Sequence, residues 1–188
     1  SQVQLVDQVS RELLEDPGVL CTNQAVIALF QGKGATVEES GRYARIRIPA
    51  SMLDAALESA PSKIVLGARD EDDQLILDAA EPRVRFGSGS ETNTWLEAQF
   101  EDGRATFHRR QGCIALLADA AHLCEQLEHL DFFIRCVNIQ DKEVTEANKD
   151  VNKFLTSLNN ITKHVQAGLT TLDALDDVVE MGRIIAGG

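Results

Sequence analysis

The run Asp131-Phe-Phe-Ile-Arg-Cys-Val-Asn138 is short and almost continuously apolar, as buried strands are. A second run, Ile161-Thr-Lys-His-Val-Gln166, is also strand-like. Each run is followed by a segment with helical periodicity, residues 142–158 and residues 171–186. Strands that alternate with helices pair in parallel through right-handed crossovers. The sequence from residue 130 onward therefore predicts an α/β fold.

A pair of parallel strands cannot stand alone, because both of its faces must be covered. The chain reaches Gly188 just after the second helical segment, where a third strand is expected. We therefore expect the front part of a larger protein: an N-terminal α+β extension followed by the first two strand–helix units of a truncated (β/α)8 TIM barrel. We predict the extension at residues 1–112 and the start of the barrel, with a connecting helix over 113–129, at residues 113–188.

Helices and alternating strands are predicted within the first 112 residues. An amphipathic stripe predicts a helix over residues 3–14, Thr22 or Asn23 is a suitable N-cap for a helix through Phe30, and Pro49 is suited to the start of a third helix. Thr36-Val37 and residues 43–48 flank a turn and predict a hairpin. Five further strands are predicted as an antiparallel meander, at residues 63–68, 75–77, 83–86, 94–100 and 105–107.

The composition, with 44% apolar and 26% charged residues, is ordinary for a globular protein. A formal net charge of −12 disfavours nucleic acid as a partner, because phosphates are repelled by an acidic surface. No apolar run approaches the roughly 20 residues that span a bilayer, and no secretory signal is recognisable. We expect no membrane partner and a cytoplasmic location.

The cysteines, at positions 21, 113, 124 and 136, show no C-x-x-C spacing. Buried free thiols in a reducing compartment account for them. A zinc site with two neighbouring histidines requires ligands on one helical face, but His122 and His129 point away from the face that carries Cys124. We expect no metal site.

The stretch Phe86-Gly-Ser-Gly-Ser-Glu-Thr-Asn93 is rich in glycine and polar residues and lies between two predicted strands. It is neither a dinucleotide fingerprint, since no helix follows it, nor a P-loop, since no Lys-Ser/Thr closes it. One interpretation is a plain hairpin connection. The other is a loop that lines a binding site, because glycines allow close backbone approach and bare N–H groups bind anions. Its candidate side chains are Ser88, Ser90, Glu91 and Asn93.

Further polar residues follow the predicted parallel strands. Asn138 lies at the carboxyl end of the first strand, and His164 and Gln166 are assigned to the same end of the second. Ligands of parallel α/β proteins bind at that end. We therefore expect His164, Gln166, Asn138 and Glu91 to bind substrate, although a lone histidine is also commonly structural. No catalytic residue is identified, since no nucleophile–base pair emerges.

An ordered set of short motifs resembles the trimethylamine methyltransferase family, which includes the glycine betaine methyltransferases. The resemblance covers essentially the whole chain but only the N-terminal part of a family member. The motifs that carry it are Glu15-Asp-Pro-Gly-Val19, Lys33-Gly-Ala-Thr-Val37, Arg45-Ile-Arg-Ile-Pro49, Ser59-Ala-Pro-Ser62, Leu66-Gly-Ala-Arg-Asp70, Arg85-Phe-Gly-Ser-Gly89, Lys163-His-Val165 and Leu175-Asp-Asp-Val-Val-Glu-Met-Gly-Arg-Ile-Ile-Ala-Gly-Gly188.

The resemblance implies a TIM barrel behind an N-terminal extension, and transfer of a methyl group from a methylated amine to the cobalt of a separate corrinoid protein. It implies that the corrinoid (cobalamin) is carried by that partner, and we expect no cofactor in this chain and no activity from it alone. Two alternatives stay open: a non-catalytic binding module, and the front of another TIM-barrel enzyme. We also expect self-association into a homo-oligomer, because the second parallel strand has an open edge.

Overall fold

The computed structural model describes residues 1–187, so that Gly188 of the predicted barrel segment lies outside them. The chain is a mixed α/β protein and divides into two compact units, Ser1–Pro61 and Ser62–Gly188. The expected α/β class is confirmed. The predicted division at residue 112 falls inside the second unit.

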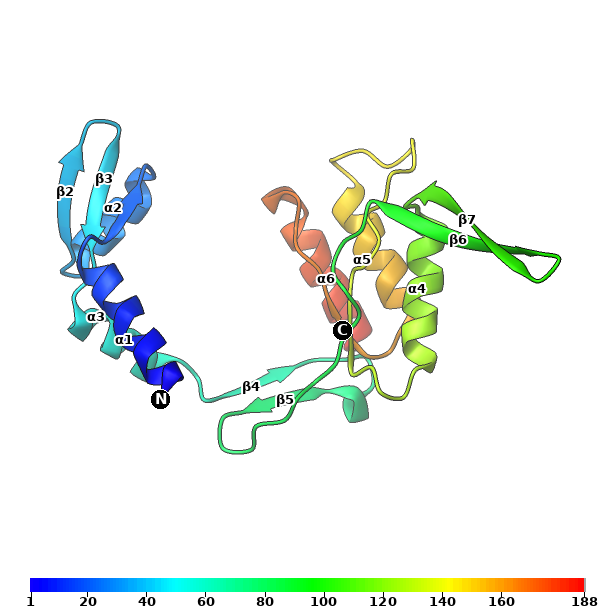
Figure 1. Ribbon diagram of the computed structural model, residues 1–188, viewed down its shortest axis with the longest axis horizontal. Helices are drawn as coiled ribbons and strands as arrows, with labels where there is room; N and C mark the ends of the chain where they lie inside the picture. Colours follow the sequence, from blue (N-terminus) through cyan, green and yellow to red (C-terminus); the bar gives the residue numbers. More distant parts are fainter. Residues whose placement is uncertain (188) are drawn as a thin grey trace. The chain divides into compact units, whose positions relative to one another are not determined.

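The first unit is a three-stranded antiparallel sheet with three helices (Figure 1). The order of its strands is β1-β3-β2. The predicted helices and hairpin are confirmed, whereas the edge strand β1 was missed because it has only three residues. The elements are α1 (Gln2–Glu15), β1 (Val19–Cys21), α2 (Gln24–Gly32), β2 (Thr36–Ser40), β3 (Tyr43–Arg47) and α3 (Ala50–Ser59).

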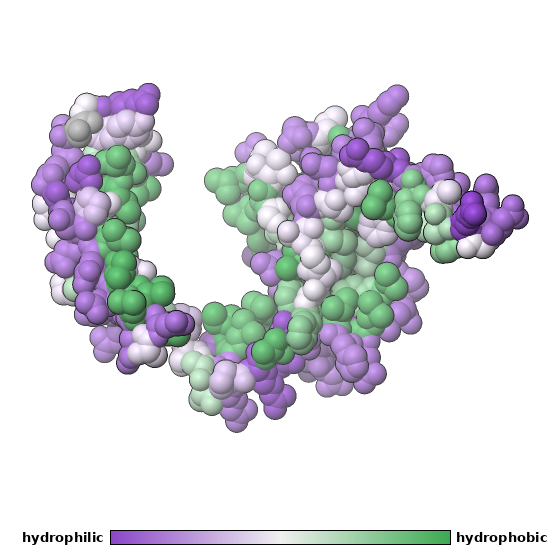
Figure 2. All heavy atoms as spheres, in the orientation of Figure 1, coloured by the Kyte–Doolittle hydropathy of each residue, from purple (hydrophilic) through white to green (hydrophobic). Residues whose placement is uncertain are grey.

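Local chemistry explains these boundaries. The Asn23 side chain accepts hydrogen bonds from the N–H groups of Ala25 and Val26, which caps α2. Gly18 has φ +77°, and a Cβ there would lie 2.3 Å from the carbonyl oxygen of Ile46, so only glycine fits between α1 and the sheet. Exposed hydrophobic side chains of the first unit gather along one of its sides (Figure 2).

The second unit contains three two-stranded sheets and three α-helices in its described residues (Figure 1). Strands β8 and β9 are parallel, with Phe132 opposite His164 and Ile134 opposite Gln166, as the alternation of strands and helices predicted. The elements are β4 (Lys63–Leu66), β5 (Leu75–Asp78), β6 (Thr94–Glu101), β7 (Arg104–Gln111), α4 (Ile114–Gln126), β8 (Phe132–Ile134), α5 (Lys149–Asn160), β9 (His164–Gln166) and α6 (Leu175–Ile185), with 3-10 turns η1 (Glu71–Asp73) and η2 (Leu172–Ala174).

The predicted meander is wrong. Strands β4 and β5 form one antiparallel hairpin and β6 and β7 another, and the two hairpins are separate sheets. Residues 83–86 are not an antiparallel strand between them. They lead instead into the glycine-rich stretch, which pairs with the parallel sheet.

The glycine-rich stretch runs beside the free edge of β8 as a third parallel segment. Parallel bridges join Gly87 to Phe132 and Thr92 to Val137, residues that in both pairs are 45 positions apart. The N–H of Thr92 donates to the carbonyl of Cys136 at 2.8 Å, and the N–H of Asn138 donates to the carbonyl of Thr92 at 2.9 Å. The parallel sheet therefore begins near residue 86, and the predicted boundary at residue 112 would cut through its connections.

The sequence pattern does not reveal this segment as a strand, because the side chain of Ser88, and not its backbone, makes the hydrogen bonds to Ile134. The hydroxyl of Ser88 donates to the carbonyl of Ile134 at 2.7 Å and accepts from the N–H of the same residue at 2.9 Å. At Gly87, a Cβ would lie 2.4 Å from the ring of Phe132. Serine and glycine are poor strand formers, yet this edge requires both of them.

The core of the second unit lies between α4 and the parallel segments. Leu117, Phe133 and Val137 are completely buried there. Figure 1 shows α4, α5 and α6 side by side in chain order, which is the arrangement of crossover helices on a parallel sheet. Helix α5 begins at Lys149, whereas helical periodicity was predicted from residue 142, and its buried residues are Asp150, Lys153 and Ser157.

Candidate functional site

The carboxyl ends of the three parallel segments lie at one edge of the sheet. Glu91, Thr92 and Asn93 end the first segment, Arg135 to Asn138 follow β8, and residues 167–170 follow β9. Hydrogen bonds tie these ends together, since the N–H of Arg135 donates to the carbonyl of Gln166 at 3.0 Å. This is the edge at which ligands of parallel α/β proteins bind.

Amide side chains link the first two ends. Asn138 Nδ2 donates to Asn93 Oδ1 at 2.8 Å, and Gln140 Nε2 donates to the Asn93 carbonyl at 2.6 Å. The Oδ1 atom of Asn138 is buried without a hydrogen-bond partner in the described residues. The neighbouring Asp141 accepts a hydrogen bond from the N–H of Ile114 at 2.8 Å, which fixes the N-terminus of α4 against the same edge.

A polar cavity of about 340 Å³ opens beside these residues. Its walls come from the glycine-rich segment, the end of β8, the first turn of α5 and the loop after β9. Arg135 forms an ion pair with Glu91 across it, with 11% of the arginine side chain exposed. The lining residues are Glu91, Arg135, Lys149, Lys153, Gly168, Leu169 and Thr170.

A buried ion pair contributes to the wall of the cavity through Lys153. Lys153 Nζ donates to Asp150 Oδ1 at 2.5 Å and to the Gly168 carbonyl, and the two side chains are 3% and 1% exposed. Asp150 also accepts from the backbone N–H and the hydroxyl of Thr170, at 2.7 and 2.9 Å, and from the N–H of Thr171 at 3.2 Å. These bonds hold the loop after β9 against α5.

The electrostatics of both carboxylates reflect this surrounding positive charge. The hydrogen bond from Arg135 lowers the pKa of Glu91 against the effect of burial, and the charges of Arg135, Lys149 and Lys153 lower it further. Burial raises the pKa of Asp150, but hydrogen bonds from Lys153, Thr170 and Thr171 outweigh burial and lower it from 3.8 to about 2. The cavity is an environment that favours carboxylates over carboxylic acids.

The structure brings together part of the predicted substrate-binding set. Glu91 lines the cavity, and Asn138 lies at the carboxyl end of β8. Gln166 ends β9 with an exposed side chain. His164 was placed at the wrong end of its strand: it is the first residue of β9, because the strand begins three residues later than the apolar pattern suggested.

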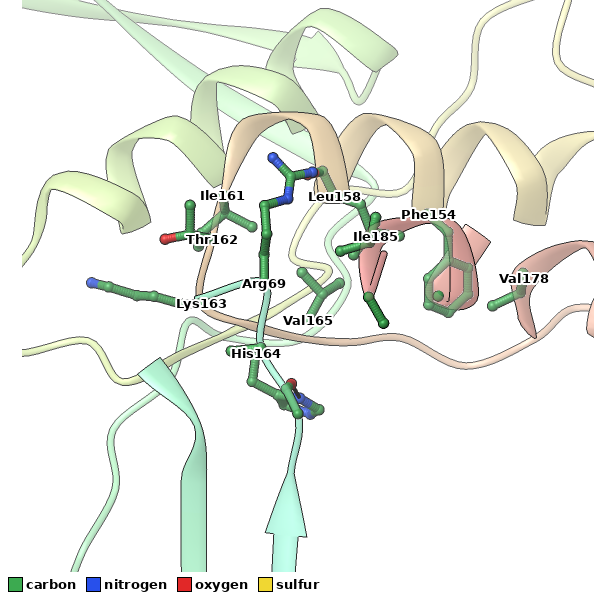
Figure 3. A pocket seen from close by; sticks show the side chains of 14 residues that line it. Arg69, Phe154, Leu158, Ile161, Thr162, Lys163, His164, Val165, Val178 and Ile185 are labelled. Carbon is green, nitrogen blue, oxygen red and sulfur yellow. Dashed lines mark hydrogen bonds between the residues drawn. The ribbon is translucent and has the colours of Figure 1, made fainter. Parts of the chain in front are cut away.

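His164 belongs to a different, largely apolar cavity of about 310 Å³ between β9, α5, α6 and residues 67–69. In Figure 3, Val165, Phe154 and Ile185 lie along one side of this cavity, while the ring of His164 points away from them. Its Nδ1 atom lies 2.7 Å from the carbonyl oxygen of Gly67. This contact gives His164 a structural partner and does not direct it toward the polar cavity.

The same segment packs against the residues that lead into β9, the strand whose edge was expected to be open. The N–H of Arg69 donates to the carbonyl of Thr162 at 2.8 Å, and its guanidinium donates to the carbonyl of Leu158. The hydroxyl of Thr162 lies 2.7 Å from Glu125 Oε1 and 3.0 Å from Asp73 Oδ2. The hydroxyl of Thr162 is therefore satisfied by groups of the chain itself.

Three cationic residues of the polar cavity were missed by sequence reasoning. Lys149 and Lys153 lie in a segment that was predicted to be a helix from its apolar residues alone. Arg135 interrupts an apolar strand, and the sequence does not show which face of the strand it occupies. The available signal was the spacing of Lys149, Asp150 and Lys153 at the start of a helix that follows a parallel strand. That position puts charged side chains at the carboxyl edge of the sheet.

The described residues, 1–187, contain neither a metal-binding cluster nor a membrane-spanning helix. No group of three or more His, Cys, Asp or Glu side chains is placed to hold a metal ion. None of the described helices is both long and apolar enough to cross a membrane. The four cysteines are free, and burial raises the pKa of the Cys124 and Cys136 thiols.

Known relatives identify the family. The family model described as trimethylamine methyltransferase (MTTB) matches residues 1–188. The chain is 27% identical to trimethylamine methyltransferase MttB of Desulfitobacterium hafniense over 94% of its length, and 27% identical to MttB of Methanosarcina barkeri over 87% of its length. These alignments cover 33% and 31% of the two relatives, so the chain spans about a third of their length. Because the family model matches from the first residue to the last, the chain belongs to the trimethylamine methyltransferase family.

Proposed function

We propose that the full-length protein containing this chain moves a methyl group from a methylated amine, of the trimethylamine or glycine betaine type, to the cobalt of a corrinoid protein. The observation that carries this proposal is the family match over residues 1–188. The family is a methyltransferase family, and the alignments place the chain against about a third of each relative. The chain alone is expected to be inactive, since a site at the edge of three parallel segments has no far wall.

The role of this chain in that protein is to supply the first strands of a (β/α)8 barrel behind an N-terminal extension. Three parallel segments support this proposal, because each is followed by a helix: α4 follows residues 86–92, α5 follows β8, and α6 follows β9. The β6–β7 hairpin is an insertion between the first segment and its helix. The polar cavity would then lie at the catalytic face of the barrel.

The corrinoid is assigned to the partner protein. It would supply a cobalt nucleophile for the methyl group. The residues of this chain would bind and orient the amine substrate at the carboxyl edge, with Asn138, Glu91 and Gln166 as the proposed contacts.

The test is transfer of an isotopic label. The full-length protein is mixed with a reduced corrinoid protein and a trideuteromethyl amine, and the corrinoid is analysed by mass spectrometry. We expect a mass increase of the corrinoid that requires all three components. Absence of label with trimethylamine, glycine betaine and N,N-dimethylglycine alike would reject the proposed function. The 188-residue chain serves as the matched control and should transfer nothing.

Self-association is proposed through the β6–β7 hairpin rather than through β9. One face of this ribbon is apolar, and its large side chains Leu96, Phe100 and Phe107 are 62%, 76% and 65% exposed. The tip carries Glu101 and Asp102 together with Arg104, which lies opposite Glu101, and at the base Arg110 is paired with Glu97. A second copy packed about a two-fold axis would join the two apolar faces.

Sedimentation of the chain at several concentrations tests this association. Phe100→Asp should convert a dimer to a monomer, while Gln99→Asp, on the polar face of the ribbon, should leave the dimer intact. A wild-type chain that is monomeric at every concentration would reject a contact between copies.

A further inference from the structure

The β4–β5 hairpin presents apolar side chains on both of its faces. Residues that pair across an antiparallel ribbon point to the same face, and the next pair along the ribbon points to the opposite face. Ile64 pairs with Leu77 on one face, and Val65 pairs with Ile76 on the other. These four side chains are 39–52% exposed. Since a two-stranded hairpin is only marginally stable in water by itself, this one requires a partner surface.

The face that carries Ile64 and Leu77 is covered at one end only. The next pair on the same face is Leu66 with Leu75, beside the loop at residues 67–74. Leu75 is 4% exposed and Leu66 is half-buried, whereas Ile64 and Leu77 at the other end are 43% and 39% exposed. This face therefore requires a further apolar surface that continues from the Leu75 end to the Leu77 end.

The loop of the hairpin is fixed at the amino end of β9. The N–H of Arg69 donates to the carbonyl of Thr162 at 2.8 Å, and the Thr162 hydroxyl lies 3.0 Å from Asp73 Oδ2. Figure 1 shows β4 and β5 at the opposite end of the second unit from β6 and β7, which follow the carboxyl end of the first parallel segment. The hairpin therefore lies at the amino end of the parallel sheet, away from the polar cavity.

The contact of His164 shows which face of the sheet the loop occupies. Neighbouring residues of a strand point to opposite faces, and Val165 points into the apolar cavity toward Phe154 and Ile185 of the helices (Figure 3). His164 points the other way, and its Nδ1 atom lies 2.7 Å from the carbonyl oxygen of Gly67. The loop thus lies against the face of β9 that is turned away from the helices, and in a closed barrel this face lines the interior.

The lengths of the relatives indicate what supplies the further apolar surface. The chain spans about a third of their length, and its three parallel segments form only part of a (β/α)8 barrel. Parallel strands of a barrel all begin at the same end, so the further strands of the full-length protein would begin beside the amino end of β9. That is the end of the sheet at which the hairpin lies.

We propose that the β4–β5 hairpin closes the amino-terminal end of the barrel, and that Ile64 and Leu77 pack against the first residues of the barrel strands that follow Gly188 in the full-length protein. This inference rests on the barrel in the proposed function, but not on the methyl transfer itself. The partner surface is a segment of the same polypeptide. The hairpin closes the end opposite to the candidate site, and the carboxyl edge with its polar cavity stays accessible.

Hydrogen exchange followed by mass spectrometry tests this closure, in the full-length protein and in the 188-residue chain. We expect the amides of residues 64–66 and 75–77 to exchange about tenfold or more slowly in the full-length protein, because covering two half-exposed apolar side chains disfavours opening of the hairpin. Leu77→Thr should remove most of this gain. Ile76→Thr is the matched control, since it changes the neighbouring residue on the opposite face, and it should keep the gain.

Three results would overturn the closure: equal exchange of the wild-type hairpin in the two proteins, equal effects of the two variants in the full-length protein, or protection in the 188-residue chain that rises with its concentration, which would assign the face to a second copy. Failure of the proposed function looks different. A protein that transfers methyl groups but does not protect the hairpin rejects the closure alone, whereas a protected hairpin in a protein that transfers no methyl group rejects the methyl transfer alone.

Discussion

Replacing Asp150 by asparagine should destabilise the second unit strongly, because this buried carboxylate has four donors around it. Asn keeps the size of the side chain but removes the charge that pairs with Lys153, whose side chain is 3% exposed. The folded state lowers the pKa of Asp150 from 3.8 to about 2. At ~1.4 kcal/mol per pKa unit, the ionised form contributes about 2 kcal/mol of stability. The unpaired ammonium of Lys153 raises the expected total loss to about 3–5 kcal/mol.

The pH dependence of this loss has a defined sign. A carboxylate whose pKa is lowered by folding contributes stability above its unfolded pKa near 4, and the contribution disappears as the pH falls toward 2. The wild-type chain should therefore lose its advantage over Asp150→Asn between pH 5 and pH 2.

Urea unfolding followed by tryptophan fluorescence measures this difference. Trp95 is the single tryptophan of the chain and packs against the core of the second unit. Asp177→Asn, an exposed aspartate of α6, is the control and should stay within about 0.5 kcal/mol of wild type. The double variant Asp150→Asn/Lys153→Met should recover part of the loss. A loss below about 1 kcal/mol at pH 7, or one that is equal at pH 3, would refute the reasoning.

Two further variants test the parallel sheet. Ser88→Ala removes both hydrogen bonds to Ile134 and should lower the free energy of unfolding in urea by about 1–3 kcal/mol. The control Ser90→Ala, at an exposed neighbouring position, should change it by almost nothing. Equal losses in the two variants would contradict the pairing of the glycine-rich stretch with β8. Gly112→Ala places a Cβ 2.2 Å from the carbonyl oxygen of Asn138, so it should cost about 1–3 kcal/mol and lower the melting temperature by several degrees. The control is Gly89→Ala, whose Cβ meets no atom within 4 Å. If Gly112→Ala is as stable as Gly89→Ala, the backbone at Gly112 and Asn138 shifts apart without cost and the close contact does not matter.

The periodic segments of the chain could be predicted from the sequence alone. Helices α1 to α4, α6 and the parallel pair β8–β9 follow apolar patterns, and α2 begins at a recognisable cap, Asn23, whereas α5 begins at Lys149 and not near residue 142 as predicted. The strand in the glycine-rich stretch could not be found in this way, because its pairing depends on the Ser88 hydroxyl and on the absence of side chains at Gly87. Such an edge carries no periodic apolar signal.

Only part of the candidate site could be reached from the sequence. The rule that ligands bind at the carboxyl ends of parallel strands pointed to Asn138, which lies at that end, whereas Glu91 was chosen as a polar residue of the glycine-rich stretch and was not assigned to a strand end. It misplaced His164, because one apolar run of six residues forms a strand of only three. The charged residues of α5 were missed since a buried Asp150–Lys153 pair on a helix looks, in the sequence, like an ordinary solvated face.

Amide hydrogen exchange of the 15N-labelled chain tests most directly that residues 86–92, β8 and β9 form one parallel sheet with a common carboxyl edge. The N–H groups of Thr92, Asn138 and Arg135 each donate across this sheet at 2.8 to 3.0 Å. We predict slow exchange of all three, together with a nuclear Overhauser contact between Thr92 and Val137. Fast exchange of Thr92 and Asn138 without that contact, while Arg135 stays protected, would mean that the glycine-rich stretch is a separate loop and that the site described at this edge does not exist.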